Sequence, residues 1–172
     1  VFYKDSKAYL TATQNVIDQE KMAIVLQEVI GSPHGEYTDQ EGNKRDAYFY
    51  PTLSGVARSL NFYPLGNETA EDGIASLALG LGKYIVDGGV TLRLSPPHPN
   101  HILQLSDTEI ALRETQTRFY ALDLQHAAET FQPDDAFNLK RLSVKEADKH
   151  GTLKHIASTY DPYDQIIRDS YY

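Results

Sequence analysis

The sequence predicts an α+β fold, with a mixed and largely antiparallel sheet that carries helices on one face. Two patterns lead to this prediction. Short β-branched or alternating apolar runs, bounded by glycine and proline, are typical of strands, and apolar residues three or four positions apart are typical of helices. A length of 172 residues allows one domain with a hydrophobic core, or one domain with a short appendage.

The first third of the chain is expected to form one helix and three strands. Apolar residues at helical spacing predict a helix over residues 4–16, and a β-branched run that ends in glycine and proline predicts a buried strand over residues 22–30. Residues 34–46 are polar and contain two glycines, so we expect a hairpin tip or a mobile loop that adds nothing to the core. Alternation predicts strands over residues 47–51 and 55–63.

The middle of the chain is expected to be helical up to a pair of glycines. A threonine N-cap, two acidic residues and apolar residues at helical spacing predict a helix over residues 70–79. The turn Gly80-Leu81-Gly82 then leads into a helical segment over residues 83–87, which Gly88-Gly89 ends. A strand is expected over residues 90–94.

A proline-rich connector over residues 95–100 divides the chain, because three prolines in six residues keep the backbone extended. Beyond it, we expect strands over residues 118–124, 139–143 and 153–158, and a short helix over residues 144–149. The chain starts without a methionine and stops soon after an apolar isoleucine pair, so we expect both ends to be cuts in a longer protein.

The composition narrows the classes of partner. The chain has 16 Lys and Arg against 24 Asp and Glu, and its net charge of -8 repels nucleic acid and anionic membranes. No apolar stretch approaches the length of a membrane span, and no signal peptide is recognisable. The absence of cysteine excludes disulfides and thiolate metal sites and fits the reducing cytosol. We therefore expect a cytoplasmic protein that holds any phosphate ligand by local charge.

The motifs for common catalytic sites are missing from the sequence. The six histidines lack the spacing of zinc ligands on a helix, and neither HExxH nor GxSxG occurs, so we predict no metal site and assign no catalytic residue. The turn Gly80-Leu81-Gly82-Lys83 is compatible with a phosphate cradle or with a plain helix boundary. It is not a Walker motif, because Tyr84 follows Lys83.

A family resemblance lies in three ordered tracts, KMAIVLQEVIGSPHG, FYPTLSGVARSLNFYP and EDGIASLALGLGKYIVDGGVTLRLSP. Together they resemble the ATP-grasp region of phosphoenolpyruvate synthase and pyruvate phosphate dikinase, from about Ala8 to Pro97. The later tracts RFYALDL and TLKHIASTYDP resemble the segments that come next in a large synthase-like subgroup. The resemblance implies that residues 1–97 are part of an ATP-grasp-like nucleotide-binding domain and that residues 98–172 are its truncated, β-rich continuation.

The resemblance also implies a two-step reaction. ATP, with Mg²⁺, phosphorylates a histidine on a swivelling domain, and the phosphohistidine then phosphorylates pyruvate in a separate barrel. Both of those domains, and the first ATP-grasp subdomain, would lie outside this chain, so we expect the chain to be inactive alone. His126 is not expected to be that histidine, because the glycine-rich lead-in of the phosphohistidine motif is absent.

Five site residues follow from the first two tracts of the resemblance. Gln27, Glu28 and Val29 match the hinge strand that lies against adenine in this family. Ser59 and Asn61 match the end of a strand whose hydroxyl and amide or carboxylate side chains line the nucleotide site.

Three more site residues follow from the third tract. Gly82 and Lys83 match the GLGE turn, with lysine in the place of glutamate, and Arg93 matches a nucleotide-binding polar position. An ammonium cannot coordinate a metal, so Lys83 either meets a phosphate, with Asp87 or Glu28 providing the carboxylate for Mg²⁺, or points into solvent. The lysine therefore also favours an alternative, a non-catalytic ATP-grasp-derived module for nucleotide sensing or domain contact.

Overall fold

The computed structural model describes residues 23–125 and 138–168, and the helices and strands below belong to these ranges. The strands are β1 (Ser32–Thr38), β2 (Lys44–Tyr50), β3 (Ser54–Arg58), β4 (Ile74–Ala78), β5 (Leu92–Leu94), β6 (Arg118–Asp123), β7 (Leu139–Ser143), β8 (Thr159–Asp161) and β9 (Ile166–Arg168). The helices are α2 (Lys83–Val86), α3 (Thr108–Arg113) and α4 (Val144–Lys149), with 3-10 turns η2 (Ala70–Asp72), η3 (Leu103–Leu105) and η4 (Thr152–His155).

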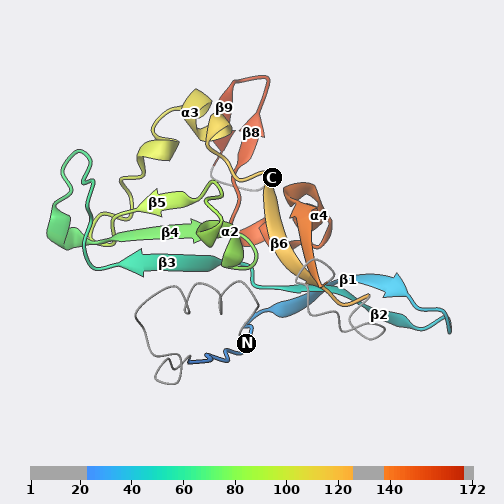
Figure 1. The fold of residues 1–172 in the computed structure, drawn as a ribbon. Helices are drawn as coiled ribbons and strands as arrows, with labels where there is room; N and C mark the ends of the chain where they lie inside the picture. The colour runs from blue at the N-terminus through green and yellow to red at the C-terminus, as the bar shows by residue number, and fades with distance from the viewer. Residues whose placement is uncertain (1–22, 126–137, 169–172) are drawn as a thin grey trace, which may run out of the picture.

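The described strands form three antiparallel units (Figure 1). Sheet A has the order β1-β2-β6-β7, sheet B has the order β3-β4-β5, and β8 pairs with β9 as a separate hairpin. Helices and antiparallel sheets occur together, so the predicted α+β class is confirmed, although no parallel pair is found among the described strands. Sheet A takes strands from both sides of the proline-rich connector, which therefore does not separate two independent sheets.

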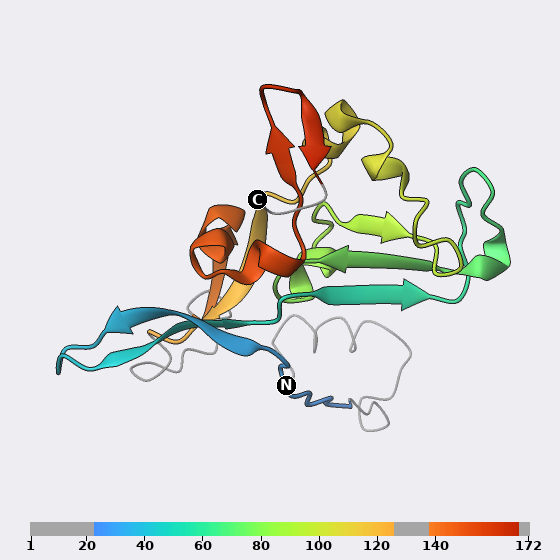
Figure 2. The ribbon, with the colours of Figure 1, turned by 180° about the vertical axis from the view of Figure 1, so that it is seen from behind.

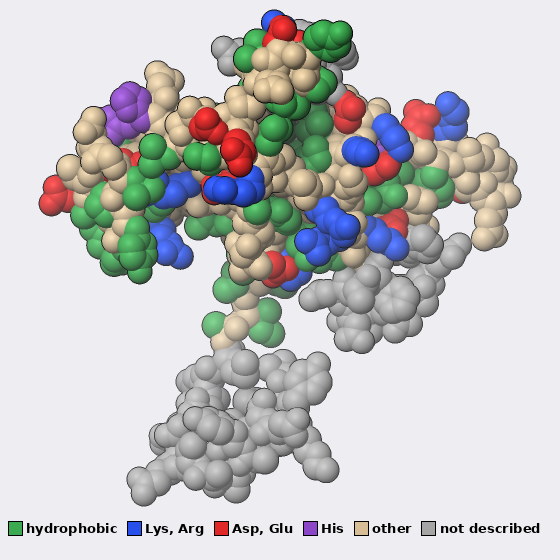
Figure 3. Space-filling view, turned by 90° about the horizontal axis from the view of Figure 1, so that it is seen from above, with side chains coloured by type: hydrophobic (Ala, Val, Ile, Leu, Met, Phe, Trp, Pro, Cys, Tyr) green, Lys and Arg blue, Asp and Glu red, His purple; other side chains and the backbone are tan. Residues whose placement is uncertain are grey.

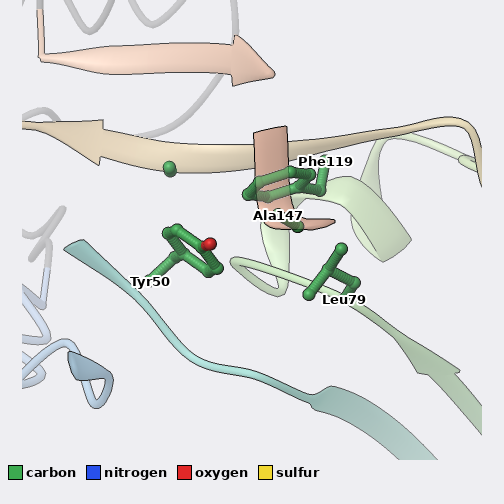
Figure 4. Close-up of a cluster of buried hydrophobic side chains, with 5 residues drawn as sticks. Tyr50, Leu79, Phe119 and Ala147 are labelled. Atoms are coloured by element: carbon green, nitrogen blue, oxygen red, sulfur yellow. The ribbon is translucent and has the colours of Figure 1, made fainter. Parts of the chain in front are cut away.

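A small core joins the two larger sheets (Figure 4). Tyr50 of β2 and Phe119 of β6 are fully buried, and their ring centroids lie 4.8 Å apart. Leu79, just after β4, and Ala147 of α4 close the cluster, together with Ala121. Because these residues come from sheet A, sheet B and α4, their burial fixes the position of sheet B against sheet A.

The buried Tyr50 also carries a polar network. Its hydroxyl lies 2.9 Å from Nδ1 of His150 and 3.0 Å from the hydroxyl of Thr152, so it is satisfied inside the core. His34 of β1 stacks on the Tyr50 ring, with 4.0 Å between centroids. A Cβ atom at Gly35 would lie 2.7 Å from Nε2 of His150, so only glycine leaves room for this histidine. The network ties the β1-β2 hairpin to α4 and η4.

An aspartate shapes the turn between β1 and β2. Oδ1 of Asp39 accepts the backbone N–H groups of Glu41 and Asn43, at 3.0 and 2.8 Å. Oδ2 accepts Nε of Arg45 at 2.8 Å, and this bond, with the backbone bonds, lowers the pKa of Asp39 to about 2. The hairpin projects away from the rest of sheet A in both ribbon views (Figures 1 and 2).

Several sequence-based predictions are wrong in whole or in part. Residues 95–100 are not an extended connector but form two turns, in which the N–H of His98 donates to the carbonyl of Ser95 and the N–H of His101 donates to the carbonyl of His98. Residues 23–30 form no strand and are exposed, because no described strand pairs with them. Residues 70–79 form only η2 followed by β4, since Gly73, at φ 71°, ends the helical turn and β3 and β5 pair with both edges of β4. Residues 153–158 contain the 3-10 turn η4. Within residues 34–46, the hairpin is confirmed, but His34 does pack on the core.

Other predictions are confirmed. The predicted strand 139–143 and helix 144–149 coincide with β7 and α4, and β6 and α2 differ from their predictions by one residue. The predicted strands 47–51, 55–63 and 90–94 overlap β2, β3 and β5, but residues 59–63 lie beyond the end of β3 and form no strand, and β5 begins only at Leu92. Helix α3 and the β8-β9 hairpin were not predicted, and the predicted helix over residues 4–16 lies outside the described ranges. None of the described helices has the length and apolar character that a membrane span requires.

The Tyr50 network makes stability depend on pH. Burial lowers the pKa of both His34 and His150, and the charge of His34 lowers that of His150 further. The unfolded chain then binds protons first, so the stabilisation is complete above a pH of about 6.5 and is lost as pH falls through the lower folded pKa values. We expect the free energy of unfolding to fall between about pH 7.5 and pH 5 in urea titrations.

Two variants show whether the histidines of the Tyr50 network, rather than other histidines, cause this pH dependence of stability. The double variant His34→Asn, His150→Gln should show a smaller loss of stability over the same pH range, whereas the exposed His101→Gln should behave like the wild type. A double variant whose unfolding free energy varies with pH as steeply as that of the wild type would contradict the assignment.

Asp39 should control the local stability of the β1-β2 turn. The variant Asp39→Ala loses two backbone acceptor bonds and one side-chain ion pair, so limited proteolysis should cut the turn several-fold faster than in the wild type. The control is Asp46→Ala, an exposed aspartate on the same hairpin. Equal cleavage rates for the two variants would show that Asp39 does not hold the turn.

Candidate functional site

Two of the sequence tracts meet at one end of sheet B. Ser54 of β3 pairs with Ala78 of β4, and the Ser54 hydroxyl donates a hydrogen bond of 2.6 Å to the carbonyl oxygen of Gly80. The tract that contains SGVARSLN and the tract that contains GLGK therefore form one structural unit. This contact brings the start of the second tract to the glycine-rich turn of the third.

The glycine-rich turn packs closely on β6. The N–H of Gly80 donates to the carbonyl of Pro51 at 3.2 Å, and the N–H of Leu81 donates to the carbonyl of Tyr120 at 2.9 Å. Gly80 has φ 84°, and a Cβ atom there would lie 2.7 Å from the Tyr120 carbonyl oxygen. These two N–H groups are used inside the protein, so they are not available to cradle a phosphate. Gly82 is the N-cap residue of α2.

Lys83 lies on the surface beside Tyr120. Its ammonium is 3.0 Å from the carboxylate of Asp87, one turn along α2, and 5.7 Å from the centroid of the Tyr120 ring. The hydrogen bond from Lys83 is the main cause that lowers the pKa of Asp87, and Tyr120 and Arg141 lower it further. Lys83 is therefore exposed, as one interpretation of the sequence expected, but it has a partner.

Asn61 and Arg93 meet at the other end of sheet B, where we call Asn61, Glu68 and Arg93 the Arg93 cluster. The two terminal nitrogens of Arg93 contact the two carboxylate oxygens of Glu68 at 2.8 and 3.3 Å. Asn61 is buried, donates to Glu68 at 2.9 Å and accepts from Arg93 at 3.3 Å. The hydrogen bonds from Arg93 are the main reason why the pKa of Glu68 lies below its usual value.

The side chains of the Arg93 cluster also form hydrogen bonds with backbone groups of the loop. Arg93 donates to the carbonyl of Tyr63 at 3.0 Å, and the N–H of Tyr63 donates to Asn61 at 3.1 Å. Glu68 accepts the N–H of Leu65 at 3.0 Å. The cluster thus organises the loop between β3 and η2. Glu68 was not predicted as a site residue, because it is a single carboxylate in a polar loop without a local pattern to mark it.

The remaining predicted site residues do not join either group. Gln27, Glu28 and Val29 lie exposed in the irregular segment 23–30, so the predicted hinge strand is absent from the structure. Ser59 is exposed just beyond β3. None of these side chains forms a hydrogen bond with another residue in the described part of the chain.

The predicted residues therefore fall into two separate groups. Gly82 and Lys83 stand at the start of α2, which lies at one end of sheet B (Figure 1). The Arg93 cluster is built on the loop between β3 and η2, which follows the other end of β3. Within the described ranges, no group of three or more His, Asp or Glu side chains is placed to hold a metal ion. A metal at Lys83 would need oxygen ligands from the nucleotide in addition to Asp87.

An apolar groove of about 970 Å³ runs between sheet B and the C-terminal segments. It is separate from the predicted site, because none of the eight predicted residues is among those that line it. The groove is lined mainly by apolar side chains, which include Leu53, Leu77, Leu79, Leu92, Leu112 and Ile156.

Over the face of the molecule seen in Figure 3, hydrophobic, acidic and basic side chains are interspersed, and no single charge dominates this face.

Comparisons with known proteins add no relative. No protein-family model matches the chain, and the comparisons with curated proteins and with solved structures found no match. The α+β architecture and the two groups of residues are therefore what the structure itself contributes to a functional assignment.

Proposed function

We propose that this chain is the ATP-binding portion of a phosphoenolpyruvate synthase-like phosphotransferase, which transfers phosphate from ATP to an enzyme histidine and then to pyruvate in other domains. The observation that carries the proposal is the contact between Ser54 and Gly80, by which two tracts of the resemblance form one unit. Tracts that resemble one nucleotide-binding region are expected to lie together if they serve one site.

Each predicted residue has a role in this proposal. Lys83 meets the phosphates as a point charge, and Asp87 provides a carboxylate for Mg²⁺, which commonly binds one or two carboxylates together with nucleotide phosphates. Asn61 and Arg93 act as positioning residues, because Glu68 and the backbone already use their polar groups. Gly82 places α2 and, with it, Lys83. Gln27, Glu28, Val29 and Ser59 would bind nucleotide only after rearrangement of exposed segments.

A second candidate is a non-catalytic module for nucleotide sensing or domain contact. A specific observation favours it, since both cations of the predicted site, Lys83 and Arg93, are paired with carboxylates of the chain itself. A phosphate would have to compete with Asp87 and Glu68 for them. This candidate requires the same fold but no phosphotransfer in the parent protein.

Weak, localised ATP binding is the expected outcome for the chain alone. Only one side of an ATP-grasp cleft is proposed to be present, so a dissociation constant of roughly millimolar, and no turnover, is expected. Amide chemical shifts in a titration with ATP and Mg²⁺ should change at Gly82 and Lys83. Lys83→Ala should weaken binding about ten-fold, whereas the exposed Lys145→Ala should leave it unchanged. A titration without site-specific shifts would contradict nucleotide binding.

The parent protein separates the two candidates. We expect the full-length parent to form phosphoenolpyruvate from pyruvate and ATP, measured by product release in the presence of Mg²⁺, and Lys83→Ala to lower that activity. A parent that binds ATP yet makes no phosphoenolpyruvate would support the non-catalytic module. Unchanged kinetics for Lys83→Ala in an active parent would remove Lys83 from the site.

A further inference from the structure

Two arginines lie on the outer face of sheet A, next to Tyr120. Arg141 of β7 pairs directly with Tyr120 of β6, and Arg118 pairs with Ser143. Side chains two positions apart on a strand share a face, and directly paired residues share it too. Arg118, Tyr120 and Arg141 are therefore neighbours on one surface, on the side opposite to the buried Phe119 and Ala121.

Neither guanidinium group forms a hydrogen bond or an ion pair with another residue in the ranges 23–125 and 138–168. By contrast, Arg45, Arg93 and Arg168 each contact a carboxylate at 2.8 Å or closer. Lys140, the residue before Arg141, lies on the inner face of the sheet. Its ammonium is 3.5 Å from the carboxylate of the buried Asp123, so this cation does have a carboxylate partner. Both arginines place a positive charge on the same face of sheet A, in a protein whose net charge is -8.

Lys83 reaches the same surface from α2. Its ammonium lies 5.7 Å from the Tyr120 ring centroid. Asp87 provides the carboxylate of this surface. The hydrogen bond from Lys83 is the main cause that lowers the pKa of Asp87, and Tyr120 and the charge of Arg141 lower it further. Three cations and one carboxylate thus gather around Tyr120, so the local charge is opposite in sign to that of the whole chain.

We propose that this surface, formed by Lys83, Arg118, Tyr120 and Arg141, binds the polyphosphate group of a nucleotide. The inference rests on the proposed function and adds Arg118 and Arg141 to the phosphate contacts of Lys83. Guanidinium groups bind phosphate oxygens in a bidentate manner, and two of them with an ammonium match the several charges of a short polyphosphate. The net charge of -8 disfavours a long polyanion such as nucleic acid, which would extend beyond this small surface.

The test uses two probes, inorganic tripolyphosphate and ATP with Mg²⁺, in titrations of the chain followed by amide chemical shifts. The wild type should show shifts at Tyr120 and Arg141 with both probes. The double variant Arg118→Gln, Arg141→Gln should bind both probes about ten-fold more weakly. The control is Arg58→Gln, since Arg58 is an exposed strand arginine of sheet B and forms no ion pair with a described residue. Thermal unfolding checks that each variant is folded. If the double variant is not folded, the single variant Arg141→Gln is tested in its place.

The possible outcomes distinguish this inference from the proposed function. If ATP binds but the arginine variants bind it as tightly as the wild type, the inference is wrong and the proposed function stands. A second outcome is that tripolyphosphate binds at this surface, while ATP changes no amide chemical shifts outside the surface. That result supports the anion site, and the assignment to ATP loses its support. If tripolyphosphate does not bind to the wild type, the inference is overturned.

Discussion

The structure depends on the burial of one tyrosine. Tyr50 is fully buried, and a buried hydroxyl without partners would cost about 1 to 3 kcal/mol. Its partners His150 and Thr152 are about a hundred residues away in the sequence, and its ring packs on Phe119 of the neighbouring strand. The hairpin, the centre of sheet A and the C-terminal segment are therefore held by the same side chain. Small domains have little core to spare, so this concentration of contacts makes the fold sensitive to a single position.

Prediction from the sequence worked where the signals are local. The strand β7 and helix α4 were predicted with the correct ends, because Ser143 caps the helix and Gly151 follows it at a φ of 72°. The strand β4 was predicted as a helix, because its apolar residues also fit helical spacing and its partners β3 and β5 are known only from tertiary contacts. The run over residues 22–30 has strand composition, but composition cannot provide a partner strand.

The candidate site could be predicted in part for the same reason. Asn61 and Arg93 were both predicted as site residues, and the structure brings them together, but through Glu68, which no local pattern marked. The glycine-rich turn shows the limit of reading a motif for function. Gly80 has a packing role, since a side chain there would collide with β6, and this role exists whether or not a nucleotide binds. The charged residues near the turn carry more information about function than the glycines do.

The β1-β2 hairpin has a consequence for the dynamics of the chain. Only Tyr48 and Phe49 of β2 pair with β6, so most of the hairpin is a two-stranded ribbon attached at one end. A ribbon of this kind opens more easily at its tip than at its base, because its contacts with the core are concentrated near Tyr50. We therefore expect amide hydrogens near Gly42 to exchange with solvent through small local openings, and those near Tyr50 to exchange only when the core itself opens. Along the hairpin, the expected rate of amide exchange therefore increases with distance from the core.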